Sequence, residues 1–137
     1  MAVNLAPPNP AKLLPVRGVA LGVAQAGIRK QGRTDLMLMR FAVGSRVAGV
    51  FTQNSFAAAP VQVCRRHLAV TESSRGLIVN AGNANCGTGD AGLAAANRTC
   101  ALVAAHLQCT PSAVLPFSTG VILENLPVER IEAALPA

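Results

Sequence analysis

The residues best suited to chemistry in this sequence lie in one short segment that runs from Phe117 to Pro127. Thr119 offers a hydroxyl group, and Gly120 offers a backbone N–H that no Cβ obstructs. Two such donors on a tight turn can stabilise the oxyanion that forms when an acyl group is transferred. Because an apolar pair, Val114 and Leu115, leads into this segment, it also fits an ordinary turn at the end of a strand. The segment alone therefore predicts either an oxyanion hole or a simple turn.

A second polar segment, from Val79 to Asp90, is rich in asparagine and glycine. The amides of Asn80, Asn83 and Asn85 both donate and accept hydrogen bonds, and asparagine tolerates left-handed backbone. We expect these side chains to cap the helix that follows and to support a polar loop beside an active site. The alternative is that each of them only stabilises its own loop.

Three glycines of the same segment predict a different function. Gly87, Gly89 and Gly92 satisfy the spacing G-x-G-x-x-G in front of a predicted helix, which is the pattern of a dinucleotide-binding loop. Six loop residues, Ala81 to Cys86, precede this pattern, whereas the fingerprint should emerge directly from the strand, and no acid lies near twenty residues further on. No partner strand in parallel crossover order is evident either. A nucleotide-binding module that uses this loop is thus the alternative function.

The composition indicates one domain, or a large piece of one, with a real core. Of the 137 residues, 51% are hydrophobic and only 3% are aromatic, so Ala, Val, Leu and Ile must build that core. No apolar run is long enough to span a membrane, and residues 1–10 do not resemble a secretory signal. We therefore expect a soluble cytoplasmic protein that does not bind membranes.

The charge distribution is uneven, with a net charge of +6. Residues 1–66 carry nine Lys or Arg and a single acid, Asp35. Because the chain has no Tyr or Trp on which bases could stack, we do not expect a nucleic-acid partner. A basic face that attracts small anionic substrates, or a plain solvated face, fits the charge equally well.

The cysteines and histidines give no sign of a metal or redox site. The four cysteines lack C-x-x-C spacing and lack paired histidines nearby, so we predict no metal; they are Cys64, Cys86, Cys100 and Cys109. We expect buried, reduced thiols, and two disulfides are the alternative that the even count allows. His67 and His106 lie on predicted helices without an acid or a second histidine one turn away. We expect surface or structural roles for both.

The periodicity of apolar residues predicts the elements that position these groups. Strands are expected at 18–28, 35–43, 46–52, 76–79 and 113–116, and helices at 60–70, 90–108 and 127–135. Gly44-Ser45 predicts a hairpin between the second and third strands, with an irregular arm over residues 1–15. Because strands and helices do not alternate strictly, we favour an α+β fold.

Four motifs occur in an order that resembles one known family. They are Phe51-Thr52-Gln53-Asn54, Ala58-Ala59-Pro60-Val61, the run from Val79 to Asn85, and Ser118-Thr119-Gly120-Val121-Ile122. From about Val16 to Leu135 the chain is similar to the N-terminal part of the bifunctional ornithine acetyltransferase / N-acetylglutamate synthase family of arginine biosynthesis. The two later motifs together are specific, whereas either alone is weak.

This resemblance implies a four-layer αββα sandwich with mixed sheets. It also implies a precursor that cuts itself in front of a threonine, which becomes the N-terminal nucleophile of a β chain. The enzyme would move an acetyl group from N-acetylornithine to glutamate without a cofactor, and acetyl-CoA is an alternative donor in some members.

The family's oxyanion hole maps onto Thr119 and Gly120. The nucleophilic threonine and the catalytic-site lysine would lie beyond residue 137, so residues 16–137 are expected to form the N-terminal part of one acetyltransferase domain. We expect a fragment that is inactive alone and that assembles with its C-terminal remainder or β chain into a hetero-oligomer. Leu123 departs from the family pattern, which often has glycine there, and we expect it to alter only the turn.

Overall fold

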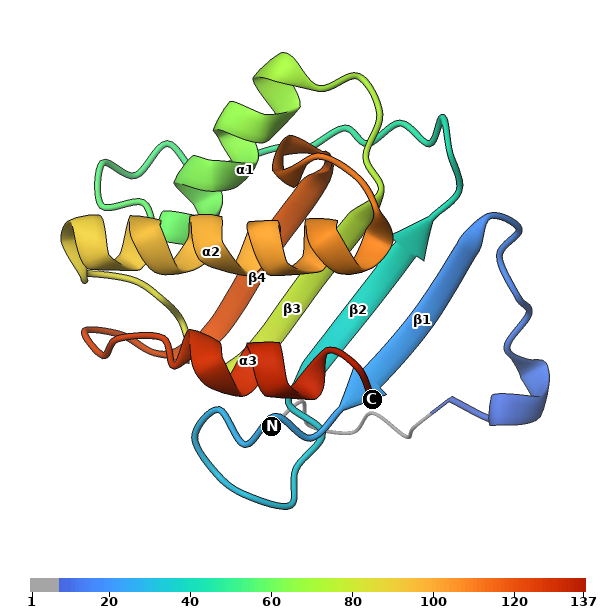
Figure 1. Ribbon diagram of the computed structural model, residues 1–137, viewed down its shortest axis with the longest axis horizontal. Helices are drawn as coiled ribbons and strands as arrows, with labels where there is room; N and C mark the ends of the chain where they lie inside the picture. The colour runs from blue at the N-terminus through green and yellow to red at the C-terminus, as the bar shows by residue number, and fades with distance from the viewer. Residues whose placement is uncertain (1–7) are drawn as a thin grey trace.

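A four-stranded mixed sheet forms the centre of the computed structural model, which describes residues 8–137 (Figure 1). Its spatial order is β1-β2-β3-β4. The first three strands pair antiparallel, and β3 pairs parallel with β4. The strands are β1 (Val19–Ala24), β2 (Leu36–Phe41), β3 (Gly76–Asn83) and β4 (Val114–Val121).

Three helices cover one face of this sheet (Figure 1). They are α1 (Ala59–Val70), α2 (Gly89–Leu107) and α3 (Val128–Ala134), and short 3-10 turns occur at η1 (Pro10–Lys12) and η2 (Pro111–Ala113). The core lies between the helices and the sheet, where Val63, Ile78, Val103, Val114 and Ile131 are fully buried. Aliphatic side chains dominate this core, as the low aromatic content predicts.

The other face of the sheet carries no helix of the described residues (Figure 1). Side chains alternate between the two faces along a strand, so the pairing register shows which residues share this open face. Its apolar side chains form two rows that cross all four strands. One row is Val23, Met37, Val79 and Phe117, and the other is Leu21, Met39, Leu77 and Leu115.

Part of this open face is exposed, although Leu115 in the second row is already buried at 2% exposure. Leu21 and Val23 are 65% and 64% exposed, and Phe117 is 45% exposed. A sheet normally buries both of its faces or presents polar side chains on the solvated one. The rows of apolar side chains therefore mark a surface that fits against another layer.

The predicted α+β fold with mixed strand pairing is confirmed, and the three predicted helices match the observed ones closely. The described residues supply one helical layer and one sheet layer of the expected sandwich. Of the predicted irregular arm, residues 1–7 lie outside the described part of the chain. Residues 8–18 contain only the turn η1.

The predicted hairpin between residues 35–43 and 46–52 is wrong. Residues 46–52 form no strand, and they could not pair with β2 because β1 and β3 occupy both of its edges. The observed hairpin joins β1 to β2 through residues 25–35. In addition, β3 and β4 run further than expected and enclose α2 in a parallel crossover, which the sequence did not reveal.

Candidate active site

Thr119 and Gly120 lie near the end of β4, and both are exposed. Their register partners on β3 are Ala81 and Gly82. The two residues are therefore still paired with a neighbouring strand, and the prediction of a tight turn at this point is wrong. By the alternation of side chains, Thr119 lies on the open face of the sheet, two positions beyond Phe117.

The backbones of Gly120 and Gly82 approach each other very closely. A Cβ on Gly120 would lie 2.3 Å from the carbonyl carbon of Gly82 and 2.6 Å from the nitrogen of Asn83. Both glycines have positive φ, +134° for Gly120 and +103° for Gly82, and the register shifts between Gly82 and Asn83. Glycine is needed at Gly120 because a side chain would collide with the backbone of the bulge.

A partly buried hydrogen bond between two side chains links β3 to β4 just before this site. The Ser118 hydroxyl donates to Oδ1 of Asn80 at 2.6 Å. Nδ2 of Asn80 in turn donates to the carbonyl of Asn83 at 2.8 Å, on the bulge itself. Asn80 is only 3% exposed, so its amide has no access to solvent and relies on these partners. Sequence reasoning missed Ser118 in this role.

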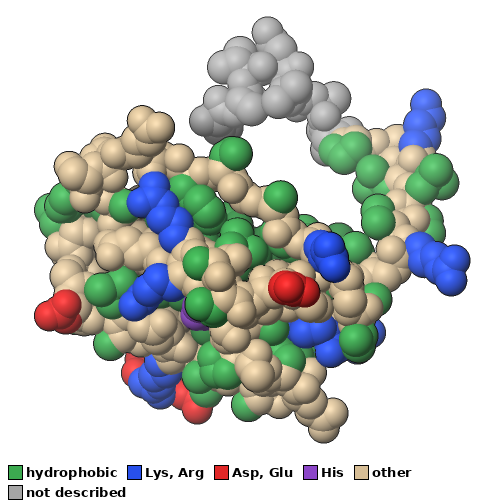
Figure 2. Space-filling view, turned by 90° about the horizontal axis from the view of Figure 1, so that it is seen from above, with side chains coloured by type: hydrophobic (Ala, Val, Ile, Leu, Met, Phe, Trp, Pro, Cys, Tyr) green, Lys and Arg blue, Asp and Glu red, His purple; other side chains and the backbone are tan. Residues whose placement is uncertain are grey.

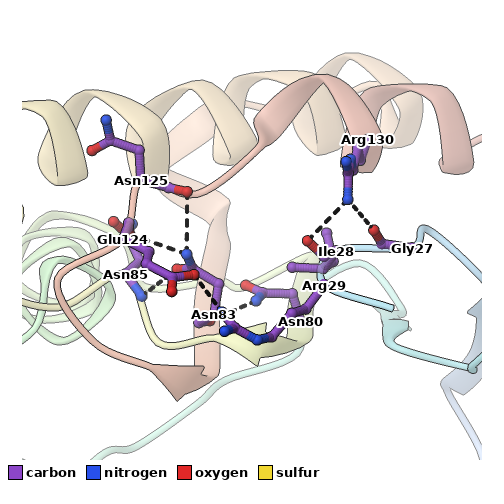
Figure 3. A network of polar contacts seen from close by, with 9 residues as sticks. All are labelled: Gly27, Ile28, Arg29, Asn80, Asn83, Asn85, Glu124, Asn125 and Arg130. Atoms are coloured by element: carbon purple, nitrogen blue, oxygen red, sulfur yellow. Dashed lines mark hydrogen bonds and ion pairs between the residues drawn. The ribbon is translucent and has the colours of Figure 1, made fainter. Parts of the chain in front are cut away.

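Asn83 and Asn85 extend this network to neighbouring loops (Figure 3). Nδ2 of Asn83 donates to the carbonyls of Glu124 at 3.0 Å and Asn125 at 3.2 Å, and its Oδ1 accepts from the backbone N–H of Asn85 at 2.7 Å. Nδ2 of Asn85 donates to the carbonyl of Gly92 in α2 at 2.9 Å. The network ties the end of β3 to the chain that follows β4 and to α2. The predicted capping of α2 is wrong, because α2 has no side-chain cap.

The three glycines that match the G-x-G-x-x-G spacing have structural roles in this loop and at the start of α2. Gly87 and Gly89 adopt positive φ. Gly92 is buried inside α2, where a Cβ would lie 2.2 Å from the Thr88 hydroxyl and 2.8 Å from Oδ1 of Asn85. The absence of a side chain at Gly92 thus makes room for the polar network.

The loop between β1 and β2 is fixed beside the same end of the sheet by Asp35. The Asp35 carboxylate accepts hydrogen bonds from the backbone N–H groups of Ala26 (2.8 Å), Gly27 (3.2 Å) and Ile28 (2.6 Å). Its carbonyl accepts from the N–H of Ala81 at 2.8 Å. The only indication of this role in the sequence was that Asp35 is the single acid in residues 1–66, which carry nine Lys or Arg.

An arginine of α3 holds the same loop from the helical side. The Arg130 guanidinium donates to the carbonyls of Gly27 and Ile28 (Figure 3). On the neighbouring surface, Arg29 pairs with Glu124. The loop that borders Ala81 therefore has side-chain anchors at both its ends.

The buried thiols and one histidine pack α1 and α2 against β4. Cys64 Sγ lies 3.2 Å from the Pro116 carbonyl, and Nδ1 of His67 lies 2.7 Å from the Val114 carbonyl. Burial raises the pKa of Cys64 to about 11 and that of Cys100 to about 12, so both thiols stay neutral at physiological pH. These groups support the strand and are not nucleophiles.

The described residues contain no group of three or more His, Cys, Asp or Glu side chains that could hold a metal ion. None of the helices within residues 8–137 has the length and apolarity needed to cross a bilayer. On the face shown in Figure 2, Lys and Arg side chains are spread over several places, so this face lacks the continuous basic track typical of nucleic-acid binding.

Comparison with known proteins gives consistent matches. The ArgJ family model matches residues 20–137. An ornithine acetyltransferase from Mycobacterium tuberculosis, solved in complex with ornithine, is 35% identical, with a TM-score of 0.82 over 87% of this chain and 64% of that one. The arginine biosynthesis bifunctional protein argJ from Bacillus halodurans is 33% identical, with a TM-score of 0.80 over 85% of this chain and 61% of that one. The chain thus spans less than two thirds of either relative.

Proposed function

This chain belongs to the ArgJ family, and on that premise we propose that it carries part of an acetyl-transfer site that serves arginine biosynthesis. The proposed reaction moves an acetyl group from N-acetylornithine to glutamate. One observation carries the proposal: a hydroxyl and a glycine amide, those of Thr119 and Gly120, are adjacent and exposed where β4 ends. The relatives solved as an ornithine acetyltransferase and as a bifunctional argJ protein support the choice of reaction.

The chemistry assigns these donors to the oxyanion. A threonine nucleophile on a complementary part attacks the acetyl carbonyl of N-acetylornithine, and the carbonyl oxygen becomes negative in the tetrahedral intermediate. The Thr119 hydroxyl and the Gly120 N–H donate to that oxygen. Ornithine leaves with a proton, the acetyl group remains on the nucleophile, and the amine of glutamate then attacks it. Because the amide bond that breaks in N-acetylornithine is replaced by the amide bond that forms on glutamate, the exchange needs no cofactor.

The complementary part is proposed to cover the open face of the sheet. The apolar rows cross all four strands on this face, and Thr119 lies on the same face just beyond them. A second sheet packed on these rows would remove them from water and would place its own residues opposite Thr119. The chain spans 61–64% of the relatives' length, which leaves a segment of suitable size to form that layer.

The oxyanion assignment is tested by substitution in the assembled enzyme. The chain would be co-expressed with the portion of the M. tuberculosis relative that it does not cover, and acetyl transfer from N-acetylornithine to glutamate would be measured. Thr119→Ala removes one donor and should lower kcat by about 10²–10³-fold, with little change in KM. Thr119→Ser keeps a hydroxyl and should retain most of the activity.

Two results would contradict the proposal. An unchanged kcat for Thr119→Ala would remove the hydroxyl from the mechanism. Acetyl transfer by the wild-type chain without its complement would show that the nucleophile lies within these 137 residues, which the proposed mechanism does not allow.

A further inference from the structure

The backbone of β4 presents every second residue to its outer edge, the one that does not pair with β3. Pro116 lies within the strand and has no N–H to give to β3, so its nitrogen faces that outer edge. From α1, His67 Nδ1 (2.7 Å) and Cys64 Sγ (3.2 Å) contact the carbonyls of Val114 and Pro116, which face the same way. Backbone groups two residues apart in a strand point in the same direction. The N–H of Gly120 therefore also faces the outer edge.

The neighbouring residue shows the opposite direction, as the alternation requires. The carbonyl of Val121 accepts from the N–H of Ala84, just beyond β3, at 2.8 Å. The pairing of β3 with β4 thus leaves the Gly120 N–H unused, which an oxyanion donor requires. The Thr119 hydroxyl on the open face and the Gly120 N–H at the outer edge lie on adjoining sides of the same strand.

The buried side chain of Asn80 holds the backbone on both sides of these donors. Its Oδ1 accepts from the Ser118 hydroxyl at 2.6 Å, and its Nδ2 donates to the Asn83 carbonyl at 2.8 Å (Figure 3). Ser118 immediately precedes Thr119, and Asn83 pairs with the residues on either side of Gly120. Asn80 is only 3% exposed and lies on the helical side of the sheet, so it has no route to a substrate on the open face.

We propose that Asn80 is a positioning residue for the two oxyanion donors, an inference that rests on the proposed function. Gly120 has no side chain to anchor its own peptide and holds a φ of +134°, so the direction of its N–H depends on what fixes its neighbours. Asn80 fixes them through Ser118 and Asn83. A misplacement of about 1 Å can lower a rate by about 100-fold, so a buried amide that never contacts substrate can control kcat.

Kinetics of the assembled enzyme separate positioning from substrate binding. Ser118→Ala removes the anchor on β4 and should lower kcat by about tenfold, with KM for N-acetylornithine changed by less than about twofold. Ser118→Thr keeps a hydroxyl and should retain about half or more of the wild-type kcat. Thr99→Ala is the matched control, because it removes another hydroxyl of a buried residue, one that donates to the Ala95 carbonyl within α2. This control should leave kcat unchanged.

A double-mutant cycle in kcat shows whether the anchor acts through Thr119. In the Thr119→Ala background the hydroxyl donor is already absent, so Ser118→Ala should lower kcat by only about threefold. An equal loss in both backgrounds would show that Ser118 acts independently of that donor. This result, an unchanged kcat for Ser118→Ala, or an equal loss in Thr99→Ala would each overturn the proposal.

The isolated chain distinguishes failure of the positioning from failure of the proposed function. In the ¹⁵N-labelled chain, Asn80→Ala should shift the amide signal of Gly120, 40 positions away in the sequence, whereas Thr99→Ala should leave it in place. An unmoved Gly120 signal in Asn80→Ala would overturn the positioning role whatever reaction the enzyme performs. If the signal shifts but the wild-type assembly transfers no acetyl group, the proposed reaction is wrong, and the control of the Gly120 amide by Asn80 stands.

Discussion

Replacing Gly120 with alanine tests the close approach of β3 and β4 on which the candidate site depends. The added Cβ would lie 2.3, 2.6 and 2.7 Å from three backbone atoms of Gly82 and Asn83. Carbon atoms normally approach each other to about 3.5–4.0 Å, and backbone atoms cannot rotate out of the way. Alanine would also have to adopt the φ of +134° that glycine holds.

The expected loss combines two effects. Overpacking against a rigid neighbour typically costs about 1–3 kcal/mol, and a side chain in a region of φ and ψ reserved for glycine costs about 1–3 kcal/mol more. We expect Gly120→Ala to lower the free energy of unfolding by about 2–6 kcal/mol. Because small domains have only about 5–15 kcal/mol in total, a loss at the upper end of that range would unfold part of the population without denaturant.

Urea unfolding followed by far-UV circular dichroism measures the effect, since the chain has no Trp or Tyr for fluorescence. Gly22→Ala is the matched control, because it lies in β1 and its Cβ would meet nothing within 4 Å. That variant should stay within about 1 kcal/mol of the wild type. Equal midpoints for the two variants would refute the close approach of Gly82 and Gly120.

Three further predictions use the same chain. Leu123 holds a φ of +63°, so Leu123→Gly should relieve about 1–2 kcal/mol of backbone strain. This gain should exceed the cost of glycine's larger entropy in the unfolded chain, so the urea midpoint should rise. A lower midpoint contradicts this. Asn80→Ala and Ser118→Ala should show a coupling of about 1 kcal/mol in a double-mutant cycle, and additive losses would disprove their bond. Because burial raises the pKa values of the Cys64 and Cys100 thiols, the unfolded chain loses these protons at a lower pH than the folded one. The free energy of unfolding should therefore fall as the pH rises from about 9 towards 11. This pH dependence should weaken in Cys64→Ala/Cys100→Ala, and an equal dependence in the variant refutes the assignment.

The helices could be predicted from the sequence because their evidence is local. Ala96, Cys100, Val103 and Ala104 recur at helical spacing, and all four are buried on α2. The segment 46–52 shows the limit of such reasoning. Its alternation suits a strand, but the predicted hairpin required a free edge on β2, and both edges of β2 are taken by β1 and β3.

The supports of the candidate site could not be predicted, since they join residues far apart in the chain. Ser118 and Asn80 are 38 positions apart, and their contact depends on the register between β3 and β4. The same holds for Asp35 and Ala81, whose contact requires the hairpin and the third strand together. Residue type alone suggested the hydrogen-bond donors at Thr119 and Gly120, whereas their place in a strand could not be predicted.

The register that joins β3 to β4 decides which hydroxyl faces outward. Ser118 lies on the helical side, where its hydroxyl is bonded to Asn80, and Thr119 next to it lies on the open face. A shift of β4 by one residue would reverse this and turn Thr119 towards the helices. In the present register the Ser118 hydroxyl bonds to the buried Asn80 amide, and the same register exposes Thr119. The exposure of Thr119 on the open face and the polar packing beneath the helices therefore depend on the same strand pairing.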